Sequence, residues 1–395
     1  MRYRMFIILA FVLCIAGCKG KKVQEDKFID SDIITITPPS QQLLKPVSDI
    51  SNLIDSVKYI KLELTDESII GYIEKIVIYK EKIYILDTQT ESLFVFDING
   101  NYLFKISQIG RGPEDYIQVD FFDIDPHNDN IVLTDLMGYF VMIFDKEGKF
   151  ISRRKIPFWV EGFSPFEDNG TILVANYRNN KHKLGQEFNL LYMDSLMQIN
   201  KAYFPYNSSY FEKRPPSPSK NGYFYYYNNN PHYYPYCGSS IYKVDRNGLI
   251  MKYNIDFGEN SFDLSYLSKG REYLNDYLSQ GNFYHLGTVL ETDEYLYFSY
   301  GKSLVASSFY SKKSGKTFDG YVFITNNIQF EGMPIDATYN SWFVKEIRVE
   351  SLMSWKKRNE NDELKDPFFL LKMDLAKTIT IEDNPILKLF KLKSF

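Results

Sequence analysis

Four aspartates lie within ten residues in the first third of the chain, and carboxylates at this spacing are able to do chemistry. They are Asp120, Asp123, Asp125 and Asp129. Paired carboxylates are what both Ca²⁺ ligation and glycoside hydrolysis require. In a strand, however, Asp123 and Asp125 would share one face, as in any strand that enters an Asp-Pro turn. The segment also lacks the glycine and the closing glutamate of an EF-hand loop. A structural turn is therefore favoured over a metal or catalytic site, and we expect no cofactor.

A second candidate is the loop sequence Gly-Arg-Gly-Pro at residues 110–113. No Lys-Ser/Thr pair follows it and no helical pattern begins there, so it is not a phosphate loop. Its glycines free the backbone, so Arg111 could be presented at a channel mouth as a fork for a carboxylate or sulfate. The alternative is a connector between two structural units, in which Arg111 binds loop carbonyls or an acid. Arg111, Glu114 and Tyr116 are the candidate ligand contacts here.

The best binding candidate is the tyrosine-rich segment 223–236, which also contains a run of three asparagines. Tyrosine faces stack on sugar rings or peptide side chains at low entropic cost, and the asparagines supply amide donors and acceptors. Its Pro and Asn content predicts a loop between the third and fourth structural units. The alternative is a pair of strands whose rings pack in the core. The candidate contacts are Tyr225, Tyr227, Tyr233 and Tyr234.

The remaining reactive residues do not form a recognisable site. The four histidines are scattered without ligand spacing, and we find no nucleophile elbow and no Cys/His pair. Metal and catalytic residues are therefore not assigned, although an active site assembled from distant loops stays open. The formal charge is −4 and the sequence has no basic stripe, so nucleic acid is not an expected partner.

The elements that must position these residues follow from a unit that recurs about every 48 residues. Each unit has a β-rich run that ends in Asp, and then a second run that ends in an Asp/Asn/Gly turn. Asp87 and Asp135 are 48 residues apart (135 − 87), as are Asp97 and Asp145 (145 − 97). Such a period, with two or more strands per repeat, is typical of propeller blades. Aromatic residues make up 17% of the chain, which agrees with an all-β protein.

The length predicts six blades. Roughly 340 residues follow Val57, which gives about 56 per blade, whereas seven blades would leave no room for insertions. Residues 57–64 alternate apolar and polar as a strand with one buried face does. Because a ring must hide its seam, we expect this strand to pair with C-terminal strands in the last blade. Residues 342–363 look helical and are predicted to lie in an insertion.

The N-terminus is predicted to be an export signal. Arg2 and Arg4 lead into an apolar run that is too short to span a bilayer, and the run ends in Ile-Ala-Gly before Cys18. This ending resembles the lipobox of bacterial lipoproteins, in which the signal is cut before the cysteine and the cysteine is lipidated. Lipidation would leave Cys237 as the remaining thiol, so no intramolecular disulfide is expected. The expected domains are a signal peptide at 1–17, the lipidated Cys18 and a tether at 18–50, and the propeller at 51–395.

Four stretches of the chain resemble a known family. Residues 106–116 (Ile-Ser-Gln-Ile-Gly-Arg-Gly-Pro-Glu-Asp-Tyr) and 122–126 (Phe-Asp-Ile-Asp-Pro) look like the signature of the six-bladed β-propeller lipoproteins of Gram-negative bacteria. Residues 64–71 and 384–389 are also similar. The chain departs from the family at Asp115, where glutamate is more frequent. The resemblance implies an all-β, six-bladed propeller that is distantly similar to NHL-repeat proteins, with an N-terminal lipoprotein signal and tether.

These patterns lead us to expect a binding or interaction module in the cell envelope. It would be held at the outer membrane through Cys18, because no aspartate follows the cysteine, and it would face either the periplasm or the exterior. The partner would be an oligosaccharide, a peptide or an envelope protein. Two alternatives stay open. One is a carbohydrate-active or lactone-cleaving enzyme that uses channel carboxylates, with or without Ca²⁺, and the other is a structural subunit of an envelope assembly.

Overall fold

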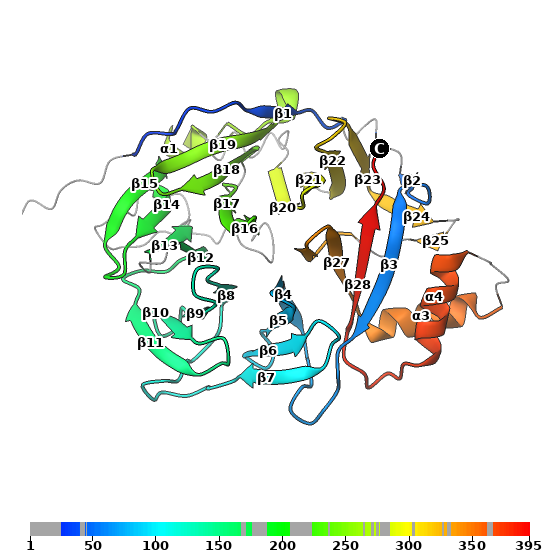
Figure 1. Cartoon of the computed structure of the whole chain (residues 1–395). Helices are drawn as coiled ribbons and strands as arrows, with labels where there is room; N and C mark the ends of the chain where they lie inside the picture. The colour runs from blue at the N-terminus through cyan, green and yellow to red at the C-terminus, as the bar shows by residue number, and fades with distance from the viewer. Residues whose placement is uncertain are drawn as a thin grey trace, which may run out of the picture.

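The chain folds, in a computed structural model, into a six-bladed propeller, with six four-stranded antiparallel sheets arranged around a common axis (Figure 1). The predicted fold is therefore confirmed in the part of the chain that the structure describes. That part consists of residues 25–39, 44, 46–166, 171–175, 188–205, 223–235, 238–263, 265–269, 272–273, 276, 285–301, 305–325, 328–329, 333–361 and 366–395.

The blades are numbered in chain order. In blades 1 to 5, the innermost strand is the first of the four in sequence. Blade 1 is β4 (Ile73–Tyr79), β5 (Lys82–Asp87), β6 (Ser92–Asp97) and β7 (Tyr102–Ile106). Blade 2 is β8 (Phe121–Ile124), β9 (Ile131–Asp135), β10 (Phe140–Phe144) and β11 (Phe150–Lys155). Blade 3 is β12 (Gly162–Phe166), β13 (Thr171–Ala175), β14 (Phe188–Met193) and β15 (Ile199–Pro205).

Blade 4 is β16 (Phe224–Tyr227), β17 (Asn230–Tyr233), β18 (Ser240–Asp245) and β19 (Gly248–Ile255). Blade 5 is β20 (His285–Glu291), β21 (Tyr295–Gly301), β22 (Ala306–Ser311) and β23 (Thr317–Gly320). Blade 6 is β26 (Ala337–Tyr339), β27 (Trp342–Ile347), β28 (Ile386–Leu392) and β3 (Ile54–Lys61). A small sheet joins β2 (Val47–Asp49), β24 (Val322–Thr325) and β25 (Ile328–Gln329), and β1 (Ile34–Ile36) is a fifth strand of blade 4.

The described helices lie outside the blades. They are a 3₁₀ turn at Gly258–Asn260, α1 (Tyr266–Lys269), α3 (Val349–Asn359) and α4 (Pro367–Lys377). The helices α3 and α4 form an insertion between β27 and β28 at the outer edge of blade 6 (Figure 1). The predicted insertion is confirmed, but its predicted helical range was wrong at one end, because Trp342–Ile347 is a strand. Within the described residues, no helix is long and apolar enough to cross a membrane.

Most residues of the middle strands are buried because both faces of these strands lie between blades, and β6 is an example with an apolar run. In β6, Leu93 and Val95 pack with blade 2, whereas Phe94 and Phe96 pack with blade 6. Successive side chains of a strand point to opposite faces, so a strand between two cores needs apolar residues at every position. In the outer strand β7, only one face packs on the blade, so more of its side chains are partly or fully exposed.

The recurring aspartates have two structural roles. Asp87, which ends β5, is fully buried and accepts hydrogen bonds from the backbone N–H groups of Gly71 and Tyr72, at the entry to its blade. Asp135, one period later, accepts in the same way from Ile117. The aspartates at the hairpin tips instead accept from the backbone of their own turns; they are Asp97, Asp145, Asp194 and Asp245. The turn chemistry predicted for these tips is confirmed.

The ring is closed by the N-terminal strand, as predicted. Antiparallel pairing runs along β28 and β3 from Ile386 opposite Lys61 to Leu392 opposite Ile54. A buried asparagine, Asn384, fastens this seam to the start of blade 1. Its side-chain amide donates to the carbonyls of Glu63 and Ser68 and accepts from the backbone N–H of Ile70.

The prediction that residues 18–50 are a free tether is wrong from Glu25 onward. Instead of hanging free, the described part of this interval is a strap around the rim of the propeller (Figure 1). Asp26 exchanges hydrogen bonds with Ala202 of blade 3, and β1 pairs in parallel with β19 of blade 4. Further on, β2 pairs in parallel with β24. Residues before the expected propeller start at 51 therefore contact the blades, since β1 is a fifth strand of blade 4 and Asp26 bonds the outer strand of blade 3.

The prediction of a loop for the tyrosine-rich segment is also wrong. Residues predicted as a loop between blades 3 and 4 form β16 and β17, the two inner strands of blade 4. Asn228 and Asn229 make the hairpin turn with φ values of 50° and 57°, a conformation that asparagine tolerates well. The alternative reading, a strand pair with packed rings, is the one observed.

A buried polar network joins this hairpin to blade 5. Glu291, which is 4% exposed, accepts from the hydroxyls of Tyr225 and Tyr253 and pairs with Lys312 at 2.6 Å. The ring of His232 stacks on that of Tyr225, with ring centres 4.9 Å apart. Because the carbonyl of Asn230 can only accept, His232 Nδ1 carries the proton of the 3.1 Å bond between them. Burial lowers the pKa of His232 to about 4.

We predict that Asn384→Ala lowers the free energy of unfolding by about 2–4 kcal/mol, because several buried backbone groups at the seam lose their partner at once. Urea unfolding followed by circular dichroism measures this change. The matched control is Asn52→Ala, since Asn52 is an exposed asparagine on the same N-terminal segment. Equal effects of the two substitutions would show that the seam does not depend on Asn384.

We also predict an acid-sensitive step in stability from His232. Because its folded pKa is lowered, protonation favours the unfolded chain, so its contribution is complete above pH ~6.5 and is lost as the pH falls toward 4, by about 3 kcal/mol. His232→Gln should flatten the stability profile in this window, as measured by urea unfolding at pH 7 and pH 4.5. The control is His127→Gln, which changes an exposed histidine and should have the same pH dependence of stability as the unmodified protein. An unchanged profile in His232→Gln would contradict the assignment.

Candidate functional site

The central axis of the propeller contains a cavity of about 130 Å³. Its walls come from the inner strands of five blades, so residues far apart in sequence meet there. The charged and polar side chains on these walls are Lys75, Tyr79, Asp123, Tyr225, Tyr226, Asn229, Asp336 and Thr338, and apolar residues of β4 and of the other inner strands complete the lining.

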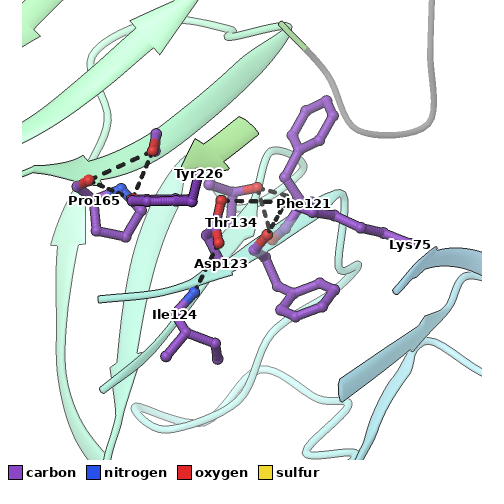
Figure 2. A network of polar contacts seen from close by, with 9 residues as sticks. Lys75, Phe121, Asp123, Ile124, Thr134, Pro165 and Tyr226 are labelled. Carbon is purple, nitrogen blue, oxygen red and sulfur yellow. Dashed lines mark hydrogen bonds and ion pairs between the residues drawn. The ribbon is translucent and has the colours of Figure 1, made fainter. Parts of the chain in front are cut away.

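The strongest polar feature of the cavity is an ion pair between blades 1 and 2. Lys75 Nζ lies 3.2 Å from Asp123 Oδ2, and it donates a 2.8 Å hydrogen bond to the carbonyl of Phe122 (Figure 2). The two side chains are only 11% and 6% exposed. Burial raises the pKa of Asp123, although Lys75 and the backbone N–H of Ile124 act in the opposite direction. The pair therefore holds a carboxyl group in a poorly hydrated site with a single cation beside it.

A hydroxyl network from blades 3 and 4 faces this pair. The hydroxyl of Tyr226 donates to the carbonyl of Pro165 at 2.6 Å and accepts from Ser164 at 2.7 Å (Figure 2). The pKa of Tyr226 is raised well above its ordinary value, first by burial and then by the negative charge of Asp123. This electrostatic coupling places the Tyr226 hydroxyl in the field of the ion pair.

The second carboxylate on the cavity wall is Asp336, which precedes the inner strand of blade 6. It pairs with Lys345 at 3.0 Å and accepts a 2.7 Å hydrogen bond from the backbone N–H of Glu346. Thr338, two residues along, lines the same cavity. The cavity thus combines two carboxylates, one lysine, a threonine hydroxyl and three tyrosines.

The structure separates the four clustered aspartates. Asp120 accepts from the backbone N–H of Leu136, and Asp125 accepts from its own turn at His127. Asp129 pairs with Lys80 and accepts from Tyr79. Of the four, Asp123 alone reaches the ion pair in the cavity. Within the described residues, no three His, Cys, Asp or Glu side chains gather as a metal site.

The Gly-Arg-Gly-Pro loop is the connector from blade 1 to blade 2. Asp115 Oδ2 accepts from the backbone N–H of Gly112, and a Cβ added at Gly110 would lie 2.2 Å from the same oxygen, so a larger residue at 110 would displace the Asp115 carboxylate. The arginine that binds a loop carbonyl is Arg153, whose guanidinium donates to the carbonyl of Gly112. Binding of a loop carbonyl was one of the two roles considered for Arg111, but the Arg111 side chain is exposed.

The other candidates of this loop differ in exposure. Glu114 is exposed, like Arg111, so both remain predictions as ligand contacts. Tyr116 is 1% exposed, and its hydroxyl donates to the carbonyls of Glu91 and Ile106. Burial raises the pKa of Tyr116, and its position is that of a core residue rather than a surface contact.

The four candidate tyrosines of blade 4 also divide. Tyr233 and Tyr234 are at most 1% exposed and pack in the core, so their rings are not available to a ligand in this arrangement. Tyr227 is half-buried, donates to Asp293 and lies under Lys312, whose Nζ is 3.9 Å from the ring centre. Tyr225 lines the cavity but donates its hydroxyl proton to Glu291. Cys18, Tyr236 and Cys237 lie outside the described residues.

Sequence reasoning missed Lys75, Tyr226 and Asp336. One signal for Lys75 was present, because Lys75 and Asp123 are 48 residues apart, which is one repeat period. The strand registers nevertheless differ, because Lys75 lies opposite Leu86 and Asp123 lies opposite Val132, so the two residues are on adjacent inner strands but not at equivalent positions. Tyr226 lay within the tyrosine-rich segment, but a loop assignment could not tell which ring faces the axis.

Comparison with solved structures supports the fold. A candidate exported protein from Bacteroides fragilis is 22% identical, with a TM-score of 0.71, and the match covers 92% of this chain and 100% of that chain. A member of the DUF4221 family from Bacteroides vulgatus is 10% identical with a TM-score of 0.48, covering 87% of this chain and 100% of that one. Virginiamycin B lyase from Staphylococcus aureus is 11% identical with a TM-score of 0.36, covering 73% and 80%. The last two similarities are too low to carry an argument.

No curated protein matches the chain. One family profile does, that of the domain of unknown function DUF4934, and it matches residues 35–391. This match runs from the strap through all six blades to the last strand. The chain therefore belongs to the DUF4934 family.

Proposed function

We propose that this protein is a lipid-anchored binding module of the outer membrane whose axial cavity binds a hydroxyl-rich ligand, with the sugar ring of an oligosaccharide as the chemical class. The observation that carries the proposal is the cavity itself, with the Lys75–Asp123 pair on its wall. Its volume is about ten times what one buried water needs by the same measure.

The chemistry of the walls fits a sugar better than an apolar ligand. Asp123 and Asp336 offer carboxylate oxygens to donating hydroxyls, while Lys75 has a third N–H that its two protein partners leave over. Tyr226 and Tyr225 bring aromatic rings to the same wall, and such rings bury area at low entropic cost. A few well-placed polar groups in a largely apolar, pre-formed pocket are typical of small-ligand sites.

The location rests on the N-terminal sequence and on one relative. The apolar run before Cys18 has the pattern of an export signal. The related protein from Bacteroides fragilis is described as a candidate for export. Acyl chains on Cys18 would gain about 0.8 kcal/mol per buried CH₂, so several chains together make a stable anchor. Periplasmic and surface-exposed orientations both fit this proposal.

A second candidate function is that of a sugar-cleaving enzyme. The observation in its favour is that burial raises the pKa of Asp123, which is the direction of shift that a general acid requires. Asp336 on the same wall would be the second carboxylate of a hydrolytic pair. Product formation by the intact protein separates this candidate from a binding module.

We predict that an oligosaccharide panel will contain a ligand that raises the melting temperature of a soluble form beginning at Lys19. A ligand present at 100 times its Kd adds about 2.7 kcal/mol to the stability of the folded state. The double variant Lys75→Met/Asp123→Asn should lose this shift while it stays folded, since it leaves no unpaired charge in the cavity. The control is Asp374→Asn, which changes an exposed carboxylate on α4 and should keep the shift.

The outcomes separate the candidates. A shift that survives in the double variant would move the ligand site away from the cavity. Cleaved product by mass spectrometry, lost in Asp123→Asn, would favour the enzyme. If no sugar raises the melting temperature and the protein instead captures a peptide or an envelope protein, the proposal of a sugar ligand is wrong.

We further predict that Cys18→Ser abolishes membrane association. Intact-mass measurement of the native protein should show the added acyl chains, and the variant should lack them and move from the membrane fraction to the soluble fraction. The matched control, Cys237→Ser, should leave acylation unchanged. Acylated protein in the Cys18→Ser variant would overturn the assignment of the anchor.

A further inference from the structure

The N-terminal strap begins on the outer edge of blade 3. The backbone N–H of Asp26 donates to the carbonyl of Ala202 in β15, and the carboxylate of Asp26 accepts from the N–H of the same residue. Glu25 accepts from the backbone N–H of Phe204. The strap then crosses to blade 4, where Ile29 donates to the carbonyl of Leu249. The docked chain is thus fixed to the rim from Glu25 onward.

Phe28 secures this crossing. Its ring lies against those of Tyr203, Phe204 and Tyr242, with ring centres 5.4–5.6 Å apart. These contacts come from the outer strands of two blades, so the strap is held by side chains as well as by backbone hydrogen bonds. Even so, Phe28 is 42% exposed on its outer side.

The distance from the rim to the proposed anchor is short. Cys18 precedes Glu25 by seven residues (25 − 18), and a fully extended chain of that length spans at most about 25 Å. A free tether over 18–50 would have allowed a distance of about 110 Å by the same measure. We call the residues between Cys18 and Glu25 the leash. The docking of the strap shortens the maximum distance between the anchor and the propeller more than fourfold, and it places the leash on one side of the ring.

The surface at this edge is compatible with a lipid surface. The tip of the β14–β15 hairpin carries Leu196, which is 76% exposed, and Phe28 of the strap, which packs against blades 3 and 4, is 42% exposed. The leash sequence contains Lys19, Lys21 and Lys22, which suit anionic headgroups. The exposed acids of the strap are Glu25 on blade 3 and Asp30 and Asp32 further along on blade 4, so the blade 3 end carries fewer of them.

We propose that the propeller lies with the outer edge of blade 3 against the membrane, so that blade 6 and its helices α3 and α4, on the opposite side of the ring, point away from it (Figure 1). The occupant of this edge is the lipid surface in which Cys18 is anchored. This inference rests on the proposed lipid anchor and adds an orientation to it. Such an orientation sets the cavity axis along the membrane and leaves both of its openings accessible.

The test uses the full-length acylated protein in vesicles of phosphatidylethanolamine and phosphatidylglycerol. A bimane fluorophore is placed at Asn200→Cys, an exposed position of β15, in a Cys237→Ser background. The matched control carries the fluorophore at Leu371→Cys, which is exposed on α4. Nitroxide groups on the lipid headgroups should quench the probe at 200 by about twofold or more, since quenching requires proximity to the interface, and should leave the probe at 371 bright.

A third variant tests the leash itself. About sixteen Gly-Ser residues inserted after Gln24 add roughly 20–24 Å of mean reach, so the quenching at 200 should fall while flotation with the vesicles persists. Equal quenching at 200 and 371, or quenching at 371 alone, would overturn the orientation. Quenching that is insensitive to the insertion would overturn the leash as its cause. Loss of flotation in the uninserted protein would instead show that the lipid anchor fails, and the orientation with it.

Discussion

The pairing of β3 with β28 is the contact on which the other blades depend. Each blade buries its faces only against its neighbours, so an open ring would expose two apolar faces and an unpaired strand edge. The N-terminal strand supplies the missing edge, and Asn384 ties the seam to the entry of blade 1. Asn384 lies just before β28, and all of its printed partners are backbone groups of the segment that leads from β3 to β4, so it ties the last blade to the first.

The strap extends the same principle to the outer rim. Blade 4 carries β1 as a fifth strand, and β2 extends a small sheet beside blade 5. Both pairings are parallel, and both cover strands that would otherwise present open edges. Closure is therefore not confined to one seam, since a continuous stretch of chain runs from blade 3 to blade 6 before the first blade begins.

Much of the fold could be predicted from the sequence because its signals are local. The aspartates at the hairpin tips bond their own turns, and the repeat period places Asp87 and Asp135 at equivalent strand ends. The strap could not be predicted in this way. Its strand Ile34–Ile36 is too short to show alternation, and its partner, Tyr253–Ile255, lies more than two hundred residues away. Pairings at that separation leave no pattern in a single sequence.

The candidate site was harder to predict than the fold for a related reason. The proline and asparagines of segment 223–236 indicate a loop, yet two asparagines form a tight hairpin turn and Pro231 lies within β17. Pairing with blade 5 through Glu291 is a tertiary contact that overrides the local preference. Arg111 looked functional because of its glycine neighbours, but the glycines serve Asp115.

The ion pair between Lys75 and Asp123 is the feature that stability alone explains least. Taking two charges out of water costs several kcal/mol per ion, and replacing such a pair with apolar residues is often neutral or stabilising by 1–4 kcal/mol. The neighbouring walls of β4 are aliphatic, so an apolar pair would fit the surroundings. A buried pair of opposite charges that lines a cavity offers both a donor and an acceptor there, which is the chemistry on which the proposed hydroxyl-rich ligand depends.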